Sequence, residues 1–413
     1  MADRTDSPKK PTQNPSQVPN APVQAFSLLR ESAKRSLAAN IVETTRGCFL
    51  RAGSHQFASF WTRDFAWAAR GVLAIDRADV VRDHVSILLS QIDSSGLVPR
   101  IFDDVASAKR VVAHTVFRWL PDGVKSWIAP VSYSRLLRAE HRGEHGTIAI
   151  DSNALVIIAA RDLHANEPDA DWLHAQTPAL LKALGFLFSL TSHGTRLVSQ
   201  SKFEDWQDSC AREGSTLYVN LLFARAFAAA RDLGLDSGSY DESTFLDLIS
   251  RTFRNSDGVF KSVVGLDVVS LDGNLMILNE PSLAELNRDG SLYARLKSHA
   301  IWSRAAIPGV CTVEDYPASE ISFFTRAVGL RYYHDRLLWS WLSGLAAKAA
   351  LRSGDREEAS RIFASLEKLA ERDGWVGEVY SPHDLSLVRT WSYRSEAPFS
   401  WGAGCVLEAL AMW

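Results

Sequence analysis

Two short segments, far apart in the chain, place carboxylates beside aromatic or small residues. They are Phe203-Glu204-Asp205-Trp206-Gln207-Asp208-Ser209 and Val376-Gly377-Glu378-Val379-Tyr380-Ser381-Pro382, and no basic residue adjoins their carboxylates. Hydrolysis of a glycosidic bond requires one carboxylic acid to protonate the leaving oxygen and one carboxylate to activate water. The two segments are therefore candidates for such a pair.

A third segment, Phe60-Trp61-Thr62-Arg63-Asp64-Phe65-Ala66-Trp67, places an Arg-Asp pair between aromatic residues. A guanidinium and a carboxylate together donate to and accept from sugar hydroxyls, while an aromatic ring stacks on the apolar face of a sugar. The structural alternative is an ion pair between Arg63 and Asp64 at the start of a helix. Together, the three segments indicate an enzyme that cleaves carbohydrates.

The composition is that of an ordinary globular protein, with 46% hydrophobic and 23% charged residues among 413. The formal net charge of -3 gives no electrostatic reason to expect a nucleic acid or a membrane as partner, so a small carbohydrate is the expected ligand. The four cysteines are widely spaced, which predicts neither a zinc site nor a disulfide framework.

The domain organisation follows from where the amphipathic pattern begins. Residues 1–22 contain five prolines among polar residues and lack the apolar core of a secretory signal, so we predict a disordered N-terminal tail. No linker-like stretch interrupts residues 23–413, which predicts a single catalytic domain. No apolar run has membrane-spanning length, and we expect a cytoplasmic protein.

Helical periodicity dominates this domain. Apolar residues recur at three or four positions near 26–41, 79–92, 150–163, 178–190, 217–233, 242–253, 337–349, 357–371 and 399–411. Short strands are predicted at 110–117 and 265–270. A helical solenoid would show a recurring motif, whereas the segments between these helices are unlike one another. The pattern therefore favours a double-layered ring of helices around one site.

The motifs, in their order, resemble the (α/α)6-barrel glycoside hydrolases that include glucoamylase, the glucosidase domain of glycogen debranching enzyme and alkaline/neutral invertase. The matching segments are Trp61-Thr62-Arg63-Asp64-Phe65, Trp206-Gln207-Asp208, Tyr333-His334-Asp335-Arg336-Leu337-Leu338-Trp339-Ser340 and Gly377-Glu378. The resemblance covers about residues 45–413. It implies an all-α fold, an (α/α)6 toroid with short β-hairpins in its loops.

The resemblance also implies an activity and a set of site residues. The activity is that of an inverting O-glycosidase, acting without a metal or cofactor on an α-glucosidic or related bond of a small oligosaccharide or glycoside. Asp208 is implied as general acid and Glu378 as general base. The implied substrate-binding residues are Trp61, Arg63, Asp64, Asp205, Trp206, His334, Asp335 and Trp339. Asp205 is the alternative acid, and Glu396 and Glu320 are the alternative bases.

Other interpretations stay open at this stage. Asp208 could instead cap the helix that begins near residue 217. A sugar isomerase or epimerase on a similar ring would use histidines for proton transfer, and an inactive carbohydrate-binding protein would need no acid or base. Asp335 and Arg336 stand where the resembled families have Asn-Gly. If Arg336 faces the cleft, it favours a small substrate with an anionic group; the alternative is that it turns outward or pairs with Asp335.

Overall fold

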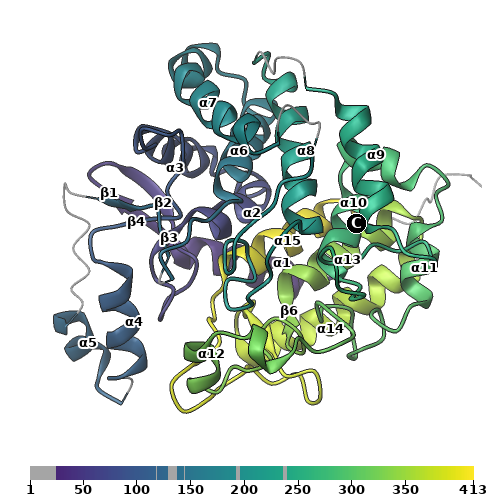
Figure 1. The fold of residues 1–413 in the computed structure, drawn as a ribbon. Coiled ribbons are helices and arrows are strands. Elements are labelled where there is room, and N and C mark those ends of the chain that lie inside the picture. The colour runs from purple at the N-terminus through teal and green to yellow at the C-terminus, as the bar shows by residue number, and fades with distance from the viewer. Residues whose placement is uncertain (1–24, 118, 129–136, 144, 192–195, 236–239) are drawn as a thin grey trace, which may run out of the picture.

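The computed structural model describes the chain except residues 1–24, 118, 129–136, 144, 192–195 and 236–239 (Figure 1). The predicted N-terminal tail therefore lies outside the described residues. The helices are α1 (Ser27–Asn40), α2 (Thr62–Leu73), α3 (Ala78–Ser90), α4 (Ser107–Thr115), α5 (Asp122–Ile128), α6 (Ser152–Asn166), α7 (Ala170–Thr191), α8 (Leu217–Asp232), α9 (Glu242–Phe253), α10 (Leu271–Asn279), α11 (Leu292–Ser298), α12 (Phe323–Ala327), α13 (Ser340–Arg352), α14 (Arg356–Asp373) and α15 (Ser400–Ala411), with 3-10 turns η1 (Pro281–Asn287) and η2 (Ala318–Glu320). None of these helices is both long and apolar enough to cross a membrane.

Six helices contact one another in a closed circuit. α2 contacts α6, α6 contacts α8, α8 contacts α10, α10 contacts α13, α13 contacts α15, and α15 contacts α2. Further helices pack against members of this circuit, namely α3 and α7 on α6, α9 on α8, α11 on α10, α14 on α13 and α1 on α15. The arrangement is compatible with the predicted all-α toroid.

Small residues allow α2 and α15 to approach closely. A Cβ atom on Gly71 would lie 2.4 Å from the Cα of Gly404, and a Cβ atom on Gly404 would lie 2.4 Å from the Cα of Ala68. Because no side chain fits between these backbones, glycine is required at both positions. The close contact between α2 and α15 therefore depends on these two glycines.

A cluster of tryptophans fills the space where α2, α13 and α15 meet. Trp401 stacks on Trp67 with ring centroids 5.9 Å apart and on Trp341 at 4.4 Å. Trp206, from the loop before α8, meets Trp341 edge-on at 5.0 Å. All four side chains are buried, so this cluster is core and supports the loop that carries Trp206.

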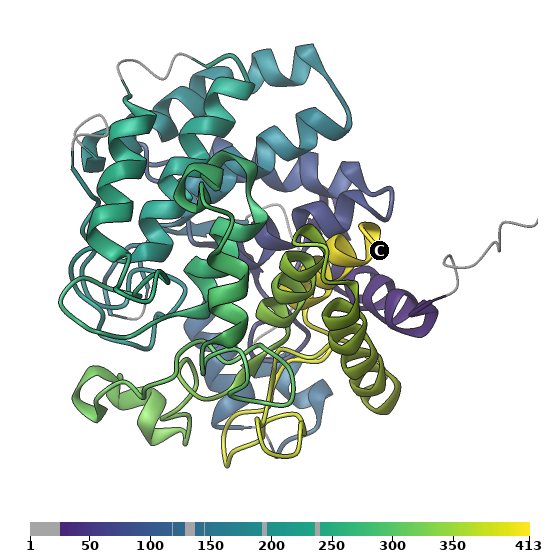
Figure 2. The same ribbon diagram turned by 90° about the vertical axis from the view of Figure 1, so that its right-hand side faces the viewer.

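The strands are short and pair locally. β1 (Ile41–Thr44) pairs with β2 (Gly47–Leu50), β3 (Phe60–Trp61) with β4 (Ile101–Asp103), β4 with β5 (Arg138–Glu140), and β6 (Leu338–Trp339) with β7 (Val379–Tyr380), all antiparallel. β3 leads directly into α2, and β6 leads directly into α13. In two views at right angles, α4, α5, α12 and the loop between β7 and α15 all lie at the same end of the molecule (Figure 1 and Figure 2).

The predicted strand at 110–117 is wrong. Most of this segment is helix α4, which ends at Thr115. Its β-branched residues produced the strand pattern, but tertiary contacts decide the conformation: the fully buried Arg110 side chain bonds to Asp103 of β4, with Nη2 2.9 Å from Oδ1. At 265–270 the backbone forms only isolated bridges, from Val269 to Lys261 and from Ser270 to Thr312.

Candidate active site

A cavity of about 410 Å³ opens beside the start of α2. Trp61 and Arg63 line it, as do Asp208 from the loop before α8, Tyr333 from the loop before β6, and Tyr393 from the loop before α15. Segments from distant parts of the chain therefore line one cavity. Three of the residues singled out from the sequence, Trp61, Arg63 and Asp208, face this cavity directly.

Asp208 lies in a turn, where the backbone N–H of Cys210 donates to the carbonyl of Gln207 at 2.8 Å. The N-cap of α8 is Thr216, so the interpretation of Asp208 as that cap is wrong. The Asp208 side chain is 41% exposed, and its carboxylate lies 3.5 Å from Arg63 Nη1 and 3.9 Å from His334 Nε2. The carboxyl group is therefore open to the cavity and to a ligand.

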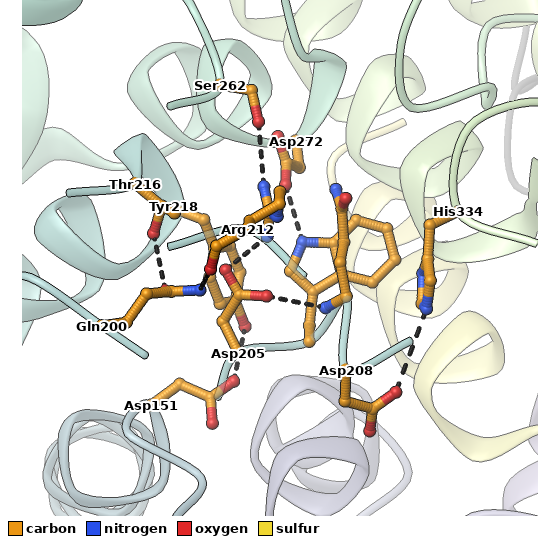
Figure 3. Close-up of polar contacts among 12 residues, drawn as sticks. Asp151, Gln200, Asp205, Asp208, Arg212, Thr216, Tyr218, Ser262, Asp272 and His334 are labelled. Atoms are coloured by element: carbon orange, nitrogen blue, oxygen red, sulfur yellow. Dashed lines mark hydrogen bonds and ion pairs between the residues drawn. The ribbon is translucent and has the colours of Figure 1, made fainter. Parts of the chain in front are cut away.

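Buried polar contacts hold the loop that carries Asp208 in place (Figure 3). Asp205 accepts the backbone N–H of Gln207 at 2.9 Å through Oδ1 and forms a buried ion pair with Arg212 through Oδ2. Arg212 in turn donates to Ser262 Oγ at 2.9 Å. Because both oxygens of Asp205 are engaged away from the cavity wall, the structure places Asp205 as a support of the loop rather than as the acid.

Trp206 supports the same loop. Its indole Nε1 donates to Asp272 Oδ2 at 2.7 Å, and only 2% of the residue is exposed. It lies in the tryptophan cluster and outside the cavity wall. Its predicted contact with substrate is therefore replaced by a packing role, because the ring is buried between core aromatics.

Arg63 pairs with a carboxylate that the sequence did not single out as a site residue. Its Nε donates to Asp151 Oδ2 at 2.7 Å, and Asp151 is the N-cap residue of α6. The predicted structural alternative, a pair between Arg63 and Asp64, is not the contact that forms. Asp151 belongs to the segment Ile150-Asp151-Ser152-Asn153, whose polar residues before an apolar helix were the available signal.

The pKa of Asp64 is affected by both candidate catalytic carboxylates, Asp208 and Glu378. Burial raises the pKa of Asp64 to about 8; the positive charge of Arg63 opposes this, and the negative charges of Glu378 and Asp208 add to it. Asp64 is therefore mostly protonated at neutral pH and can donate a hydrogen bond. The charges of Asp208 and Glu378 thus act on Asp64, although of these three residues only Asp208 is among the described residues that line the cavity.

Glu378 is buried immediately before β7, and two tyrosines of the cavity wall bond to it. Tyr333 donates to Oε1, and Tyr393 donates to Oε2 at 2.7 Å. The backbone N–H of Glu396 donates to Oε2 at 3.0 Å. Burial raises the pKa of Glu378, the hydrogen bonds from Tyr333, the Glu396 backbone and Tyr393 partly offset this, and the negative charge of Asp208 adds to the rise. No motif in the sequence pointed to Tyr393.

The alternative bases occupy other positions. Glu396 accepts backbone N–H groups from Ser54, His55 and Phe57 at 2.8 to 2.9 Å, so it anchors the loop before β3. Burial, followed by the charge of Glu378, raises the pKa of Glu396 to about 7. Glu320 lies in η2 and is not part of the cavity wall.

The rings of His334 and Trp339 stack on each other outside the cavity wall. Their rings are 5.6 Å apart and nearly parallel, and both side chains are buried. Burial, together with the positive charges of Arg212 and Arg63, holds the pKa of His334 well below its usual range, so the ring is neutral. His334 reaches Asp208 from the protein side, whereas Trp339 donates to the carbonyl of Tyr333 at 3.1 Å. Neither residue lines the cavity.

Asp335 and Arg336 are engaged outside the cavity wall. Asp335 accepts the backbone N–H of Tyr316 at 3.0 Å and Arg331 Nη1 at 3.1 Å, so its predicted contact with substrate is replaced by a structural one. Arg336 does not face the cleft: its guanidinium is 45% exposed, bonds to Asp315 and lies 3.8 Å from the centroid of the Tyr332 ring. The prediction of an anionic substrate, which rested on Arg336, therefore loses its basis.

No group of three histidine, cysteine, aspartate or glutamate side chains in the described part of the chain is placed to hold a metal ion. The chain matches no protein-family model and no curated protein.

Solved structures of similar fold exist. The GH63 mannosylglycerate hydrolase from Thermus thermophilus in complex with glucose has a TM-score of 0.62 and 17% identity, over 92% of this chain and 99% of that one. The same enzyme with Tris and D-glycerate has a TM-score of 0.61, 17% identity and the same coverage. A glycosidase variant in complex with glucose has a TM-score of 0.63 and 14% identity, over 94% of this chain and 97% of that one. At these identities the comparison shows that the chain shares its fold with glycosidases of this architecture.

Proposed function

We propose that the protein is a glycoside hydrolase that inverts the anomeric centre, with Asp208 as general acid and Glu378 as general base. The observation that carries this proposal is that Asp208 lines the cavity, and that Tyr333 and Tyr393, which line it too, bond to Glu378, a buried carboxylate that is not itself part of the wall. The glycosidase neighbours, two of them holding glucose, support the same class of reaction.

The acid and the base differ in their surroundings, as the reaction requires. Asp208 is partly exposed beside the cavity, where its proton can reach a leaving oxygen. An ionised carboxylate has about four lone-pair sites, and three sites of Glu378 accept hydrogen bonds from Tyr333, Tyr393 and the backbone of Glu396. The remaining site is on Oε1, and in this proposal it takes the proton from the attacking water.

Arg63 and Asp64 hold the sugar in this proposal. Arg63 is fixed by Asp151 and still faces the cavity, so its guanidinium presents donors in a defined orientation. A protonated Asp64 donates to a sugar hydroxyl and accepts from another. The ring of Trp61 lies beside them and would stack on the sugar. The guanidinium carbon of Arg100 lies over this ring, 4.8 Å from its centroid.

The isomerase or epimerase alternative has less support. That chemistry needs a histidine that reaches the substrate, and His334 is buried and neutral. Among the described residues that line the cavity, the histidine is His145, which stacks on Phe203 at 4.3 Å.

A panel of α- and β-linked aryl glycosides and disaccharides tests the proposal, with proton NMR of the first product formed. Release of the anomer opposite to the substrate's supports inversion, which requires carboxyl groups roughly 6.5 to 9.5 Å apart. Release of the same anomer assigns a retaining mechanism. Conversion of a free sugar to its isomer without bond cleavage supports the alternative.

A further inference from the structure

One face of α4 lines the cavity with apolar side chains. Ala108, Val112 and Val116 are spaced four residues apart, and all three belong to the wall. Val112 is 46% exposed and Val116 is 54% exposed, so neither residue contributes to the core. Val112 of α4 and Val116, the C-cap residue that follows the helix, are therefore exposed at the cavity.

The orientation of α4 is fixed by its other face. Arg110 is 1% exposed and donates through Nε to Ser59 Oγ at 3.1 Å as well as pairing with Asp103. Ala113, also on this face, is buried. Because the buried ion pair anchors the inner face of the helix, the valines of the outer face point to the cavity.

A second segment, around α12, also lines the cavity. Phe324 of α12, with Val328 and Leu330 after it, belongs to the wall, and so does the polar residue Thr325; Phe324 is 63% exposed. Two further polar residues of the wall are occupied with each other, since Ser322 Oγ lies 3.5 Å from His145 Nε2. Valines and a phenylalanine exposed on the wall of one cavity are typical of a surface that a ligand covers.

The cavity therefore has two zones of different chemistry. The inner zone contains Arg63, whose side chain is 11% exposed, and Tyr393, which is 6% exposed. The outer zone is formed by Val112, Val116 and Phe324, which are 46%, 54% and 63% exposed. A sugar has hydroxyls to satisfy and fits the inner zone, beside the candidate acid and base. Whatever group is linked to the sugar then lies against Val112, Val116 and Phe324.

We propose that the outer zone is a binding site for an apolar leaving group, and that the preferred substrates are glycosides of alkyl, aryl or terpenoid alcohols. This inference rests on the proposed glycosidase function and specifies its substrate class. It differs from a second sugar or a glycerate as leaving group, because these groups need hydrogen-bond partners that the valine face does not offer.

A series of n-alkyl glycosides tests this inference, from methyl to hexyl, with the sugar that the panel identifies. The pKa values of these alcohols are nearly equal, so chain length changes binding without changing leaving-group chemistry. We expect kcat/KM to rise by roughly two-fold per methylene, below the four-fold or so of complete burial. The glycosyl fluoride of the same sugar has no alkyl group and reports on hydrolysis alone. Turnover of the fluoride with no dependence on chain length overturns the inference and leaves the glycosidase function intact.

Paired variants locate the site. The Val112→Thr/Val116→Thr double variant keeps the side-chain shapes and adds hydroxyls, so we expect the ratio of kcat/KM for the hexyl glycoside to that for the fluoride to fall by about three-fold or more. Val124→Thr on α5 is the matched control, because Val124 is 40% exposed and not part of the wall. An equal fall in the control, or an unchanged ratio in the double variant, contradicts the inference.

Binding provides an independent readout. If the fluoride is not hydrolysed, the glycosidase proposal fails, but calorimetric titration of the wild-type protein with the same alkyl series still tests the outer zone. Affinity that rises with chain length and weakens in the double variant supports an apolar site. Equal affinities along the series overturn it. A change in sedimentation of the double variant would assign the valine face to contact between copies of the chain.

Discussion

The phenolic oxygen of Tyr393 lies 2.7 Å from Oε2 of Glu378 and donates its hydrogen to the buried carboxylate. This bond favours the ionised form of Glu378, whereas burial favours the protonated form and raises its pKa. In the proposed mechanism Glu378 is the general base and works only when ionised, so we expect kcat/KM to fall as the pH decreases through its pKa. In that mechanism the hydrogen bond extends activity to lower pH.

Tyr393→Phe should move the acidic limb of the pH profile upward. Loss of a hydrogen bond to a charged group raises the pKa of Glu378 by about one unit. The measurement is kcat/KM across the pH range, compared with Tyr240→Phe, a partly buried tyrosine whose buried hydroxyl has no hydrogen-bond partner among the described residues. An unmoved acidic limb in Tyr393→Phe would exclude Glu378 as the group that titrates there.

Substitution of the acid and of the base should give different signatures. Asp208→Asn removes the proton donor, so it should lower turnover of alkyl glycosides by roughly 10²- to 10⁴-fold and affect glycosyl fluorides much less, since fluoride needs little protonation. Glu378→Gln should impair both substrates alike. Steady-state kinetics with both substrates decide the assignment. If Asp208→Asn loses activity equally on both, Asp208 is not the acid.

Asp64 should destabilise the protein at alkaline pH. Its pKa rises from 3.8 to about 8 on folding, so between these values the folded state holds a proton that the unfolded state has lost. Stability is therefore full below pH 4 and declines as the pH rises toward 8. Asp64→Asn removes this dependence and should be more stable than wild type at pH 8, by on the order of a few kcal/mol, with the difference vanishing near pH 4.

Urea unfolding at both pH values measures this effect of Asp64. The same variant should keep much of its activity at neutral pH, because an amide, like a protonated carboxylic acid, both donates and accepts a hydrogen bond. Equal stabilities of variant and wild type at pH 8 would show that Asp64 is ionised in the folded protein.

The ion pair beneath the Asp208 loop should matter for stability far more than its counterparts on the surface. Asp205→Asn leaves the Arg212 guanidinium buried without its anion, which costs about 3 to 5 kcal/mol. Asp247→Asn breaks an exposed pair with Arg251 in α9 and should cost less than about 1 kcal/mol. Denaturant titrations compare the two variants. Similar small losses would mean that the Asp208 loop does not depend on Asp205.

Three residues that the sequence singled out, Trp61, Arg63 and Asp208, line one cavity. Each belongs to a short segment that contains aromatic residues, which is a local pattern. Partners from distant segments could not be predicted in the same way. The ion pair of Arg63 with Asp151 joins α2 to α6, and that of Arg336 with Asp315 joins two loops. Such contacts depend on how the helices pack, which a local pattern does not contain.

Side-chain direction was equally beyond the sequence. Trp206 and Trp339 occupy motif positions, yet their rings turn inward to the core because the tryptophans of α13 and α15 and the ring of His334 offer them partners. The helical periods near 79–92, 217–233 and 242–253 did correspond to α3, α8 and α9, since an apolar stripe on a helix is a local property.

The contact between α15 and α2 determines when the protein can finish folding during its synthesis. α2 emerges from the ribosome early, with Gly71 and the face that α15 will cover still bare. The segment with Glu378 and then α15 emerge only after all the other described helices. Between the synthesis of α2 and that of α15, the growing chain must therefore keep this helix face uncovered, and exposed apolar surface of this kind favours misassociation.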